Sequence, residues 1–322
     1  MDTVIALLKD EMDAVEGQFK KHLTSDVQLV SQVGNYVLSS GGKRIRPMLL
    51  LLCARLCDYR GDKHIDLAGV VEFIHTATLL HDDVVDSANL RRGNRSANSV
   101  WGNQASVLVG DFLFAKSFSV MVGSESLKIL KILSDTTTQL AEGEILQLIN
   151  TCDIDVDEPR YLQVVRDKTA ILIAASCQVA GVLAGVDDAH ETALREFGLE
   201  IGTAFQLMDD ALDYVADEED FGKERGHDLY EGKMTLPLIH AYANSSEPEQ
   251  QEIRRIIDAE ELSKEDLDYV CQLIDTKDGI RYTHTKASER IEKAKQQLAL
   301  FPDSEARQAL YTLADYVVSR NK

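Results

Sequence analysis

Residues 73–86 read Phe-Ile-His-Thr-Ala-Thr-Leu-Leu-His-Asp-Asp-Val-Val-Asp, an apolar run that ends in three aspartates spaced Asp-Asp-x-x-Asp. A run this apolar, ending in charged residues, is typical of a helix in a protein core. In a helix, Asp82 and Asp86 share a face and lie roughly 6 Å apart along the axis, because each residue rises about 1.5 Å. Two such carboxylates repel each other unless a cation binds between them. This stretch therefore predicts a helix that ends at a cation site.

The same spacing recurs at Asp209, Asp210 and Asp213, again after an apolar run, residues 201–208. Carboxylates are rarely buried unless they are paired or bound to metal. Hard oxygen ligands suit Mg²⁺, which keeps several waters and completes its shell with substrate phosphates. One such cluster is ordinarily a solvated acidic face. Two copies in similar apolar surroundings favour a site for magnesium and an anionic ligand.

Long segments elsewhere show apolar residues at intervals of three and four, and the chain has 5 prolines among 322 residues. We find no Pro/Gly/Ser-rich linker, low-complexity tract or repeat of solenoid length. The pattern predicts an all-α fold and a single domain over residues 1–322.

The charge balance argues against a nucleic-acid partner. Lys+Arg number 34 and Asp+Glu 54, a formal charge of -20, whereas nucleic-acid binding needs a basic face. Part of the acidic excess falls in residues 247–278, which we expect to form exposed helices that favour solubility.

The five cysteines form no zinc-binding spacing, and an odd number favours reduced thiols. Residues 1–21 resemble an amphipathic charged helix rather than a secretion signal. The longest apolar run, residues 171–186, is too short to span a bilayer. We therefore expect a cytoplasmic protein without an integral membrane segment.

A basic stretch precedes the apolar segment 48–56. Gly41 and Gly42 allow a tight turn, Pro47 suits the first turn of a helix, and a helix N-terminus attracts anions. Lys43, Arg44 and Arg46 can therefore form a cradle for a diphosphate, although an ordinary basic helix cap has the same composition.

Further polar residues follow or precede the motifs, and each is weak evidence alone. Arg91-Arg92-Gly93 stands where the first motif helix should end, and Lys168-Thr169 stands ahead of an apolar helix over residues 170–184. Lys223 and Lys233 follow glycines in loops that could close over a phosphate. His75 and Gln206 fall on the carboxylate side of their helices. His75 could donate to a diphosphate or be a satisfied core histidine.

Together these segments resemble the trans-prenyl diphosphate synthases, enzymes that elongate isoprenoid chains head to tail. The similarity is greatest to the bacterial long-chain branch, the octaprenyl-type synthases that make quinone side chains. The resemblance is carried by Gly42–Pro47, His75, Leu80–Asp86, Arg91–Gly93, Gly110-Asp111, Lys168-Thr169, Phe205–Asp213, Gly222-Lys223 and Gly232–Thr235.

The resemblance implies a bundle of about ten or more helices around a central cavity, with the catalytic motifs within residues 41–237. It also implies a homodimer. With substrate bound, Asp82, Asp86 and Asp209 would hold a cluster of about three Mg²⁺ ions. Asp83, Asp210 and Asp213 would act on this cluster through water or neighbouring groups. The allylic diphosphate would be held by Arg91, Lys168, Gln206, Lys223 and Lys233. Isopentenyl diphosphate would be held by Lys43, Arg46, His75 and Arg92, with Thr169 between the two substrates. Catalysis would rest on Asp82, Asp83, Asp86, Arg91, Lys168, Asp209, Asp210 and Lys223.

Product length is expected to depend on Ala77 and Thr78, which precede the first motif by one helical turn. In short-chain relatives bulky aromatic residues at these positions block the product tunnel, whereas here both are small. We expect Met121 and Leu133 to form the floor, ahead of Phe118 and Val120, and an octaprenyl product made from farnesyl diphosphate.

Three other functions compete with elongation. A terpene cyclase shares the fold and the first motif, but its second motif mixes Asn/Asp, Ser/Thr and Glu, and Lys43, Arg46 and Arg92 would be unexplained. A non-catalytic subunit of a heteromeric synthase would be expected to lack some motif residues. A metal-buffering or scaffold protein would not need the basic residues.

Overall fold

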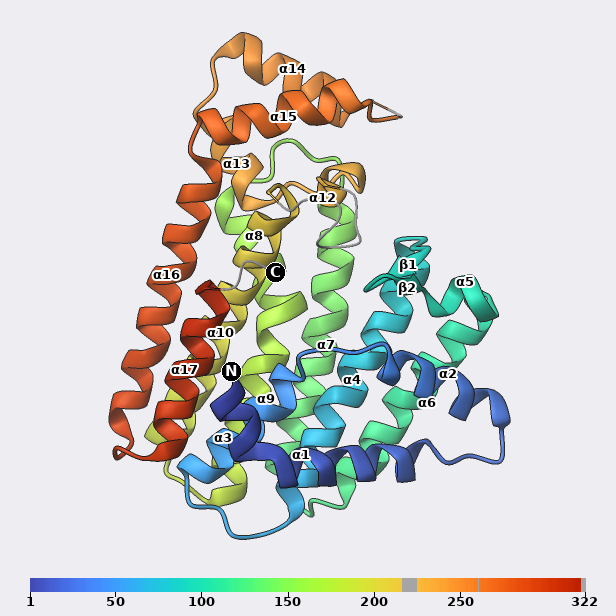
Figure 1. Ribbon diagram of the computed structural model, residues 1–322, viewed down its shortest axis with the longest axis vertical. Helices are drawn as coiled ribbons and strands as arrows, with labels where there is room; N and C mark the ends of the chain where they lie inside the picture. Colours follow the sequence, from blue (N-terminus) through green and yellow to red (C-terminus); the bar gives the residue numbers. More distant parts are fainter. Residues whose placement is uncertain (216–224, 260, 320–322) are drawn as a thin grey trace. The chain divides into compact units, whose positions relative to one another are not determined.

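The computed structural model describes residues 1–215, 225–259 and 261–319. Within them the chain is almost entirely helical, and the sheet consists of two short antiparallel strands, β1 (Leu90–Arg91) and β2 (Asn94–Arg95) (Figure 1). The expectation of an all-α fold is confirmed.

The chain forms two compact units. Unit 1 comprises Met1–Thr137, Leu172–Gly198 and Gln297–Leu313, and unit 2 comprises Thr138–Ile171, Leu199–Gln296 and Ala314–Lys322. The first acidic motif lies in unit 1 and the second in unit 2. A single domain over residues 1–322 stays a prediction.

Unit 1 contains most of the N-terminal half of the chain. Its complete helices are α1 (Asp2–Leu23), α2 (Gln28–Ser39), α3 (Ile45–Leu56), α4 (Lys63–Val85), α5 (Ala97–Trp101), α6 (Asn103–Val122) and the 3₁₀ turn η2 (Leu298–Leu300). Within the described ranges, five further helices contribute residues to both units: α7 (Leu127–Asn150), α9 (Ile171–Ala184), α10 (Asp188–Asp213), α17 (Glu305–Ser319) and α16 (Gly279–Gln297), of which only Gln297 belongs to unit 1.

Helix α4 is the centre of unit 1 and carries the first acidic motif at its C-terminal end. It packs against α6, α3 and α1, and α1 crosses it (Figure 1). Phe73 and Ile74 are buried, and the Phe73 ring meets the Phe19 ring of α1 edge to face at 4.7 Å. Apolar contacts on several sides of α4 therefore hold the motif at a fixed place at the helix end.

Unit 2 contains the elements around the second motif. They are α8 (Glu158–Val164), the π-helical turn η1 (Val165–Ala170), α12 (His227–Tyr230), α13 (Leu236–Ala243), α14 (Glu247–Ile257), α15 (Lys264–Thr276) and α16 (Gly279–Gln297).

The segment before the predicted helix 170–184 is also helical. The structure is continuous from α8 through the π-helical turn η1 into α9, so Lys168 and Thr169 lie inside a helix rather than ahead of one. Two glycines let this turn approach its neighbours: a Cβ at Gly143 of α7 would lie 2.7 Å from the backbone of Asp167, and one at Gly202 of α10 would lie 2.6 Å from the Cα of Ala170. Close backbone packing thus fixes η1 on both sides.

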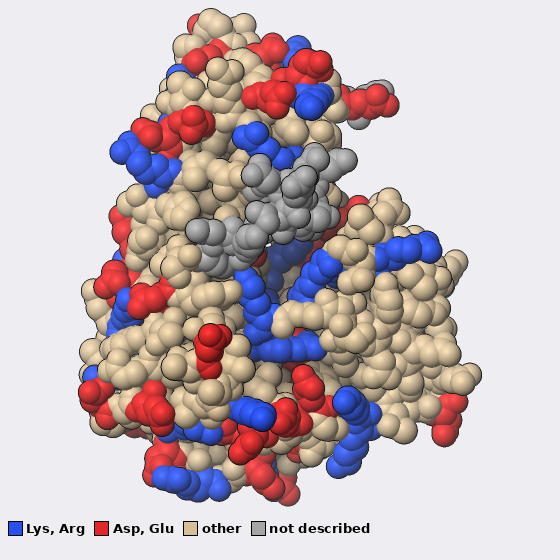
Figure 2. All heavy atoms as spheres, in the orientation of Figure 1, with Lys and Arg blue, Asp and Glu red and all other residues tan. Residues whose placement is uncertain are grey.

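Residues 247–278 form the exposed helices expected from their charge. Acidic side chains, with some basic ones among them, lie over α14 and α15 (Figure 2). Arg255 of α14 pairs with Asp266 of α15, and both helices begin with a capping box. Acidic residues nevertheless outnumber basic ones in this segment, so it keeps the excess negative charge seen in the sequence.

By length and composition alone, two stretches are apolar enough to cross a membrane, α6 and Glu158–Ala184. The second is longer than the apolar run expected from the sequence, because α8, η1 and α9 are continuous. Core helices meet the same criterion, and 61% of the apolar window in Glu158–Ala184 is buried. The absence of an integral membrane segment stays a prediction.

Candidate active site

The three aspartates of the first motif differ in their exposure. Asp83 is 2% exposed, whereas Asp82 and Asp86 are half-buried. This difference follows from helix geometry, since Asp82 and Asp86 share a face and Asp83 is rotated by about 100°. Asp82 and Asp86 are thus the two carboxylates of this motif that a solvent-borne cation can reach.

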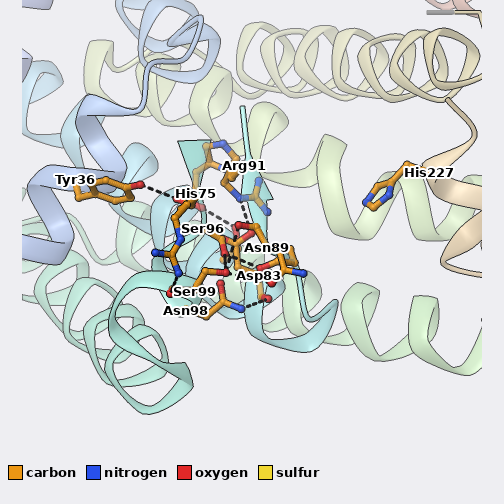
Figure 3. Close-up of polar contacts among 12 residues, drawn as sticks. Tyr36, His75, Asp83, Asn89, Arg91, Ser96, Asn98, Ser99 and His227 are labelled. Carbon is orange, nitrogen blue, oxygen red and sulfur yellow. Dashed lines mark hydrogen bonds and ion pairs between the residues drawn. The ribbon is translucent and has the colours of Figure 1, made fainter. Parts of the chain in front are cut away.

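Asp83 is held by two neighbouring side chains (Figure 3). Nε of Arg91 donates to Oδ1 of Asp83 at 2.6 Å, and the Nδ2 of Asn98 donates to its backbone oxygen at 3.0 Å. A buried carboxylate is stable when it is paired in this way. Asp83 therefore acts as an anchor for Arg91 in the unliganded protein.

The sequence suggested that Arg91 and Arg92 stand at the end of the first motif helix, but the structure places them elsewhere. Helix α4 ends at Val85, and the arginines belong to the β1–β2 hairpin, with Arg92 and Gly93 as its two-residue turn. Both turn residues have positive φ, 53° and 76°, as a type I′ turn requires. Basic side chains gather over this hairpin (Figure 2).

The remaining basic residues of unit 1 surround His75. Helix α3 begins at Ile45, earlier than expected, so Arg46 lies in its first turn and Lys43 is exposed just before it. Burial, and then the charges of Arg46, Arg92, Arg91 and Arg44, lower the pKa of His75 well below its usual value. These surroundings favour the neutral form of His75, and the charges of the four arginines would favour an anion bound near it.

The three aspartates of the second motif differ in exposure in the same way as those of the first. Asp210 is 4% exposed, whereas Asp209 and Asp213 are half-buried. Nε2 of Gln206 donates to Oδ1 of Asp210 at 2.7 Å, and the hydroxyl of Tyr161 donates to its Oδ2. In both motifs, then, the middle aspartate is buried and accepts hydrogen bonds from protein side chains, whereas the outer two are half-buried.

A chain of hydrogen bonds links the second motif to the π-helical turn. Oγ1 of Thr169 donates to Oε1 of Gln206 at 2.9 Å, and Gln206 in turn donates to Asp210. Thr169, Gln206 and Asp210 line a cavity of about 150 Å³ together with Lys168 and Lys233. Five of the residues expected from the sequence are thus brought together within unit 2.

Both lysines of this cavity are paired with acids. Nζ of Lys168 lies 2.7 Å from Oε2 of Glu144, and Nζ of Lys233 lies 2.5 Å from Oε2 of Glu231. A bound diphosphate would therefore replace Glu144 and Glu231 as the anionic partner of Lys168 and Lys233.

Asp228 is an acidic residue that the sequence analysis did not single out. Its backbone N–H donates to Oδ2 of Asp213 at 3.0 Å, and its side chain lines the cavity. Burial and the carboxylates of Asp210 and Asp213 raise the pKa of Asp228 well above its usual value. The group of carboxyls at the second motif therefore extends beyond its three aspartates, and the surroundings of Asp228 favour its protonated form.

Tyr161 was also missed. Its ring is buried and its partner Asp210 lies 49 positions later, so no local sequence pattern connects the two. The sequence signal was weak: Tyr161 stands seven residues before Lys168, in a segment for which the sequence predicted no element.

The donor set fits a magnesium ion that shares its ligands with a substrate. Among the described residues, no three His, Cys, Asp or Glu side chains converge to hold a metal by themselves. Each motif instead offers two accessible carboxylates. Mg²⁺ is typically bound in this way, by one or two carboxylates, waters and substrate phosphates.

Four of the residues named in the sequence analysis were expected to determine product length rather than to bind the diphosphates. Ala77, Met121 and Leu133 are fully buried in unit 1, and Thr78 is half-buried with its hydroxyl donating to the backbone of His75 at 2.8 Å. Phe118 and Val120 are only half-buried. Lys223 lies outside the described residues.

Comparisons with known proteins identify the family of this chain. The family model for polyprenyl synthetase matches residues 27–274. The octaprenyl diphosphate synthase of Escherichia coli (strain K12) is 44% identical over 322 residues, which cover 100% of this chain and 99% of that protein. The all-trans-nonaprenyl-diphosphate synthase (geranyl-diphosphate specific) of Rhodobacter capsulatus is 40% identical, with 98% and 97% covered.

A similar solved structure is that of a polyprenyl synthase from Caulobacter crescentus CB15, complexed with calcium and isoprenyl diphosphate. It superposes with a TM-score of 0.96 and 43% identity, covering 100% of this chain and 98% of that one. The resemblance carried by the acidic motifs and the basic residues is thereby confirmed. The chain belongs to the polyprenyl synthetase family.

Proposed function

We propose that this chain is a magnesium-dependent trans-polyprenyl diphosphate synthase. It condenses an allylic diphosphate, with farnesyl diphosphate as the starter, with successive isopentenyl diphosphates and releases diphosphate at each step. The product is octaprenyl diphosphate, destined for a quinone side chain. The observation that carries the proposal is the difference in burial within both motifs, where the outer aspartates are half-buried and the middle one is buried and accepts hydrogen bonds from protein side chains.

In this proposal Asp82, Asp86 and Asp209 ligate a cluster of about three Mg²⁺ ions together with phosphate oxygens of the allylic substrate. When bound, the ions stabilise the charge that develops on the leaving diphosphate. Asp83 and Asp210 serve the cluster indirectly, because both carboxylates already accept hydrogen bonds from protein groups.

The allylic diphosphate is held by Arg91, Lys168, Gln206, Lys223 and Lys233. Lys168, Gln206 and Lys233 line one cavity in unit 2, which supports their grouping. Cations that are fixed before the reaction stabilise the leaving group without a reorganisation cost at the moment the bond breaks. Pairing with Glu144 and Glu231 keeps the two lysines in place until substrate arrives.

Isopentenyl diphosphate is held by Lys43, Arg46, His75 and Arg92. The neutral His75 can donate one hydrogen bond to the diphosphate while the surrounding cations supply the charge. The double bond of this substrate attacks the allylic cation, and the released diphosphate takes the proton. Thr169 lies between the substrates, and closely packed helices exclude the water that would otherwise capture the cation.

Product length is set in unit 1. Ala77 and Thr78 leave room for a growing chain beside α4, and the buried Met121 and Leu133 are better placed to form a floor than the half-buried Phe118 and Val120.

The proposed enzyme is a cytoplasmic homodimer. The outward face of α6 carries Gln104, Val107, Leu108, Asp111, Ala115, Ser119 and Val122, of which one is charged. Leu108 is 66% and Val122 64% exposed. A long helix face with so few charges suits a second copy of the chain. Leu108→Glu should therefore give a monomer in sedimentation experiments, while the exposed Leu90→Glu, on the β1–β2 hairpin, should leave the dimer intact. A monomeric wild-type protein would contradict the dimer.

The activity is tested by incubating the protein with farnesyl diphosphate, labelled isopentenyl diphosphate and Mg²⁺ and separating the products by chromatography. We expect octaprenyl diphosphate as the main product and no product without divalent metal. Labelled cyclic hydrocarbons, or no chain longer than the starter, would refute elongase activity.

A further inference from the structure

Arg44 stands between two residues of the proposed isopentenyl diphosphate site but faces the other way. It adopts a left-handed conformation, φ 50°, at the start of α3. Its Nη1 pairs with the carboxylate of Glu72 on α4, and its Nη2 donates to the backbone oxygen of Leu38 at 2.7 Å. Its guanidinium also lies 6.0 Å from the ring centroid of Phe19.

Glu72 is a buried acid in an apolar helix. Its side chain is 7% exposed, and that of Arg44 is 19% exposed. A buried carboxylate requires a cation close to it, and the planar fork of Arg can serve two acceptors at once where Lys cannot. Arg44 thus joins the end of α2, the start of α3 and the middle of α4.

Glu72 and His75 are three residues apart on α4 and share a helix face. Burial and the charges of four arginines, Arg44 included, lower the pKa of His75, so these cations gather around the histidine. Burial and the charge of Arg91 lower the pKa of Arg92, and the charge of Glu72 opposes this shift; Nη1 of Arg92 donates to the backbone oxygen of Gly41. The Gly41–Arg46 segment is therefore tied to its surroundings on both sides of Lys43.

We propose that Glu72 and Arg44 are positioning residues for isopentenyl diphosphate: their ion pair holds Lys43 and Arg46 in register with His75. The inference rests on the proposed function, since it assumes that these three residues bind that substrate. Neither Glu72 nor Arg44 touches the substrate itself. The left-handed backbone at Arg44 turns its side chain toward α4, so that Lys43 and Arg46 can serve the diphosphate.

If Glu72 acted only through its charge, its removal would change the binding of isopentenyl diphosphate in the opposite direction to that expected for a positioning residue. Removing a negative charge near an anion site strengthens anion binding if the geometry of the site is unchanged. Removing a positioning residue weakens binding although the site becomes more positive. The sign of the change in KM for isopentenyl diphosphate therefore separates the two roles.

The test is steady-state kinetics of Glu72→Gln, with KM measured separately for isopentenyl and farnesyl diphosphate. We expect KM for isopentenyl diphosphate to rise about tenfold, the order of one charge-assisted hydrogen bond, and KM for farnesyl diphosphate to stay within about twofold. The matched control is Glu11→Gln, which removes the acid of another ion pair of unit 1, with Arg55. We expect no change in either KM for this variant.

Arg44→Lys is the second variant, because it leaves Glu72 a cationic neighbour and avoids an unpaired buried charge. It should show the same selective rise in KM, and combining it with Glu72→Gln should add little. A fall in KM for isopentenyl diphosphate, equal rises for both substrates, or no change in either variant would overturn the inference alone. A wild-type protein that adds no isoprene unit would overturn the proposed function and this inference with it.

Discussion

Arg91 and Asp83 are joined by a hydrogen bond of 2.6 Å from Nε to Oδ1, which ties the β1–β2 hairpin to the end of α4. Because the same hairpin carries Arg92 at its turn, one buried bond places two arginines that are assigned to different substrates. The strength of this bond should therefore influence both diphosphate sites.

Asp83→Asn should destabilise the protein and raise KM for both substrates. Loss of a charge-assisted bond at a buried carboxylate costs about 1–3 kcal/mol, which would be seen as a lower midpoint in thermal or urea unfolding. Asp58→Asn is the control, since the Asp58–Arg60 pair is exposed and such pairs contribute little. Equal stability of the two variants would show that the Asp83–Arg91 bond does not anchor the hairpin.

Tyr161→Phe should weaken metal binding. Without the hydroxyl, Oδ2 of Asp210 loses a buried donor and the second motif becomes less ordered, at a cost of about 1–2 kcal/mol. Binding of Mn²⁺ with inorganic diphosphate, followed by electron paramagnetic resonance, measures this directly. The control Tyr282→Phe removes a hydroxyl that donates to Glu158 in the same unit. If the two variants bind Mn²⁺ equally well, Tyr161 does not support the site.

Stability of the metal-free protein should depend on Asp210 between about pH 4 and pH 7. Burial raises the pKa of this carboxyl from 3.8 to about 7, against the opposing hydrogen bonds from Tyr161 and Gln206. The folded state binds this proton more tightly than the unfolded state, so the stabilisation is present at low pH and is lost as pH rises through the folded pKa.

Wild-type protein should therefore lose stability relative to Asp210→Asn as pH rises over this range, by on the order of 4 kcal/mol at most. Urea unfolding of both proteins with a chelator present, at several pH values, gives the difference. Asp188→Asn, at an exposed side chain, controls for the loss of one carboxylate. A difference between wild type and Asp210→Asn that is constant with pH would contradict the raised pKa.

Ala77→Tyr should shorten the product. Ala77 is completely buried on α4, so a tyrosine there would occupy space that the proposed product tunnel needs. Product chromatography should show chains shorter than those of the wild type, with elongation of short starters retained. Leu133→Ala is the opposite change, since it would lower the proposed floor and lengthen the product. An unchanged product from Ala77→Tyr would argue against a tunnel at this position.

The sequence predicted the helices that carry the motifs better than the connections between them. Asp82 and Asp86 share a face simply because they are four residues apart, so their accessibility follows from helix geometry. The hairpin with Arg91 was missed because its strands have two residues each and show no alternation of apolar and polar residues. Arg-Gly is also not among the usual signals of a two-residue turn.

Contacts between distant residues could not be predicted from local patterns. The bonds of Tyr161 with Asp210 and of Arg44 with Glu72 join residues 49 and 28 positions apart. A single buried glutamate inside an apolar helix, Glu72, was nevertheless a signal that could have been followed, because such an acid requires a cation.

The π-helical turn η1 changes the direction in which side chains point along the continuous helix formed by α8, η1 and α9. An α-helix advances about 100° per residue, so the additional residue in η1 rotates everything after Ala170 relative to everything before Val165. Tyr161 can thereby face the carboxylate of Asp210 while Ile171 and its successors keep their apolar side in the core. Removing one residue from η1 would rotate Lys168 away from the cavity or expose the apolar side of α9. The length of η1 is therefore as important to this enzyme as any side chain within it.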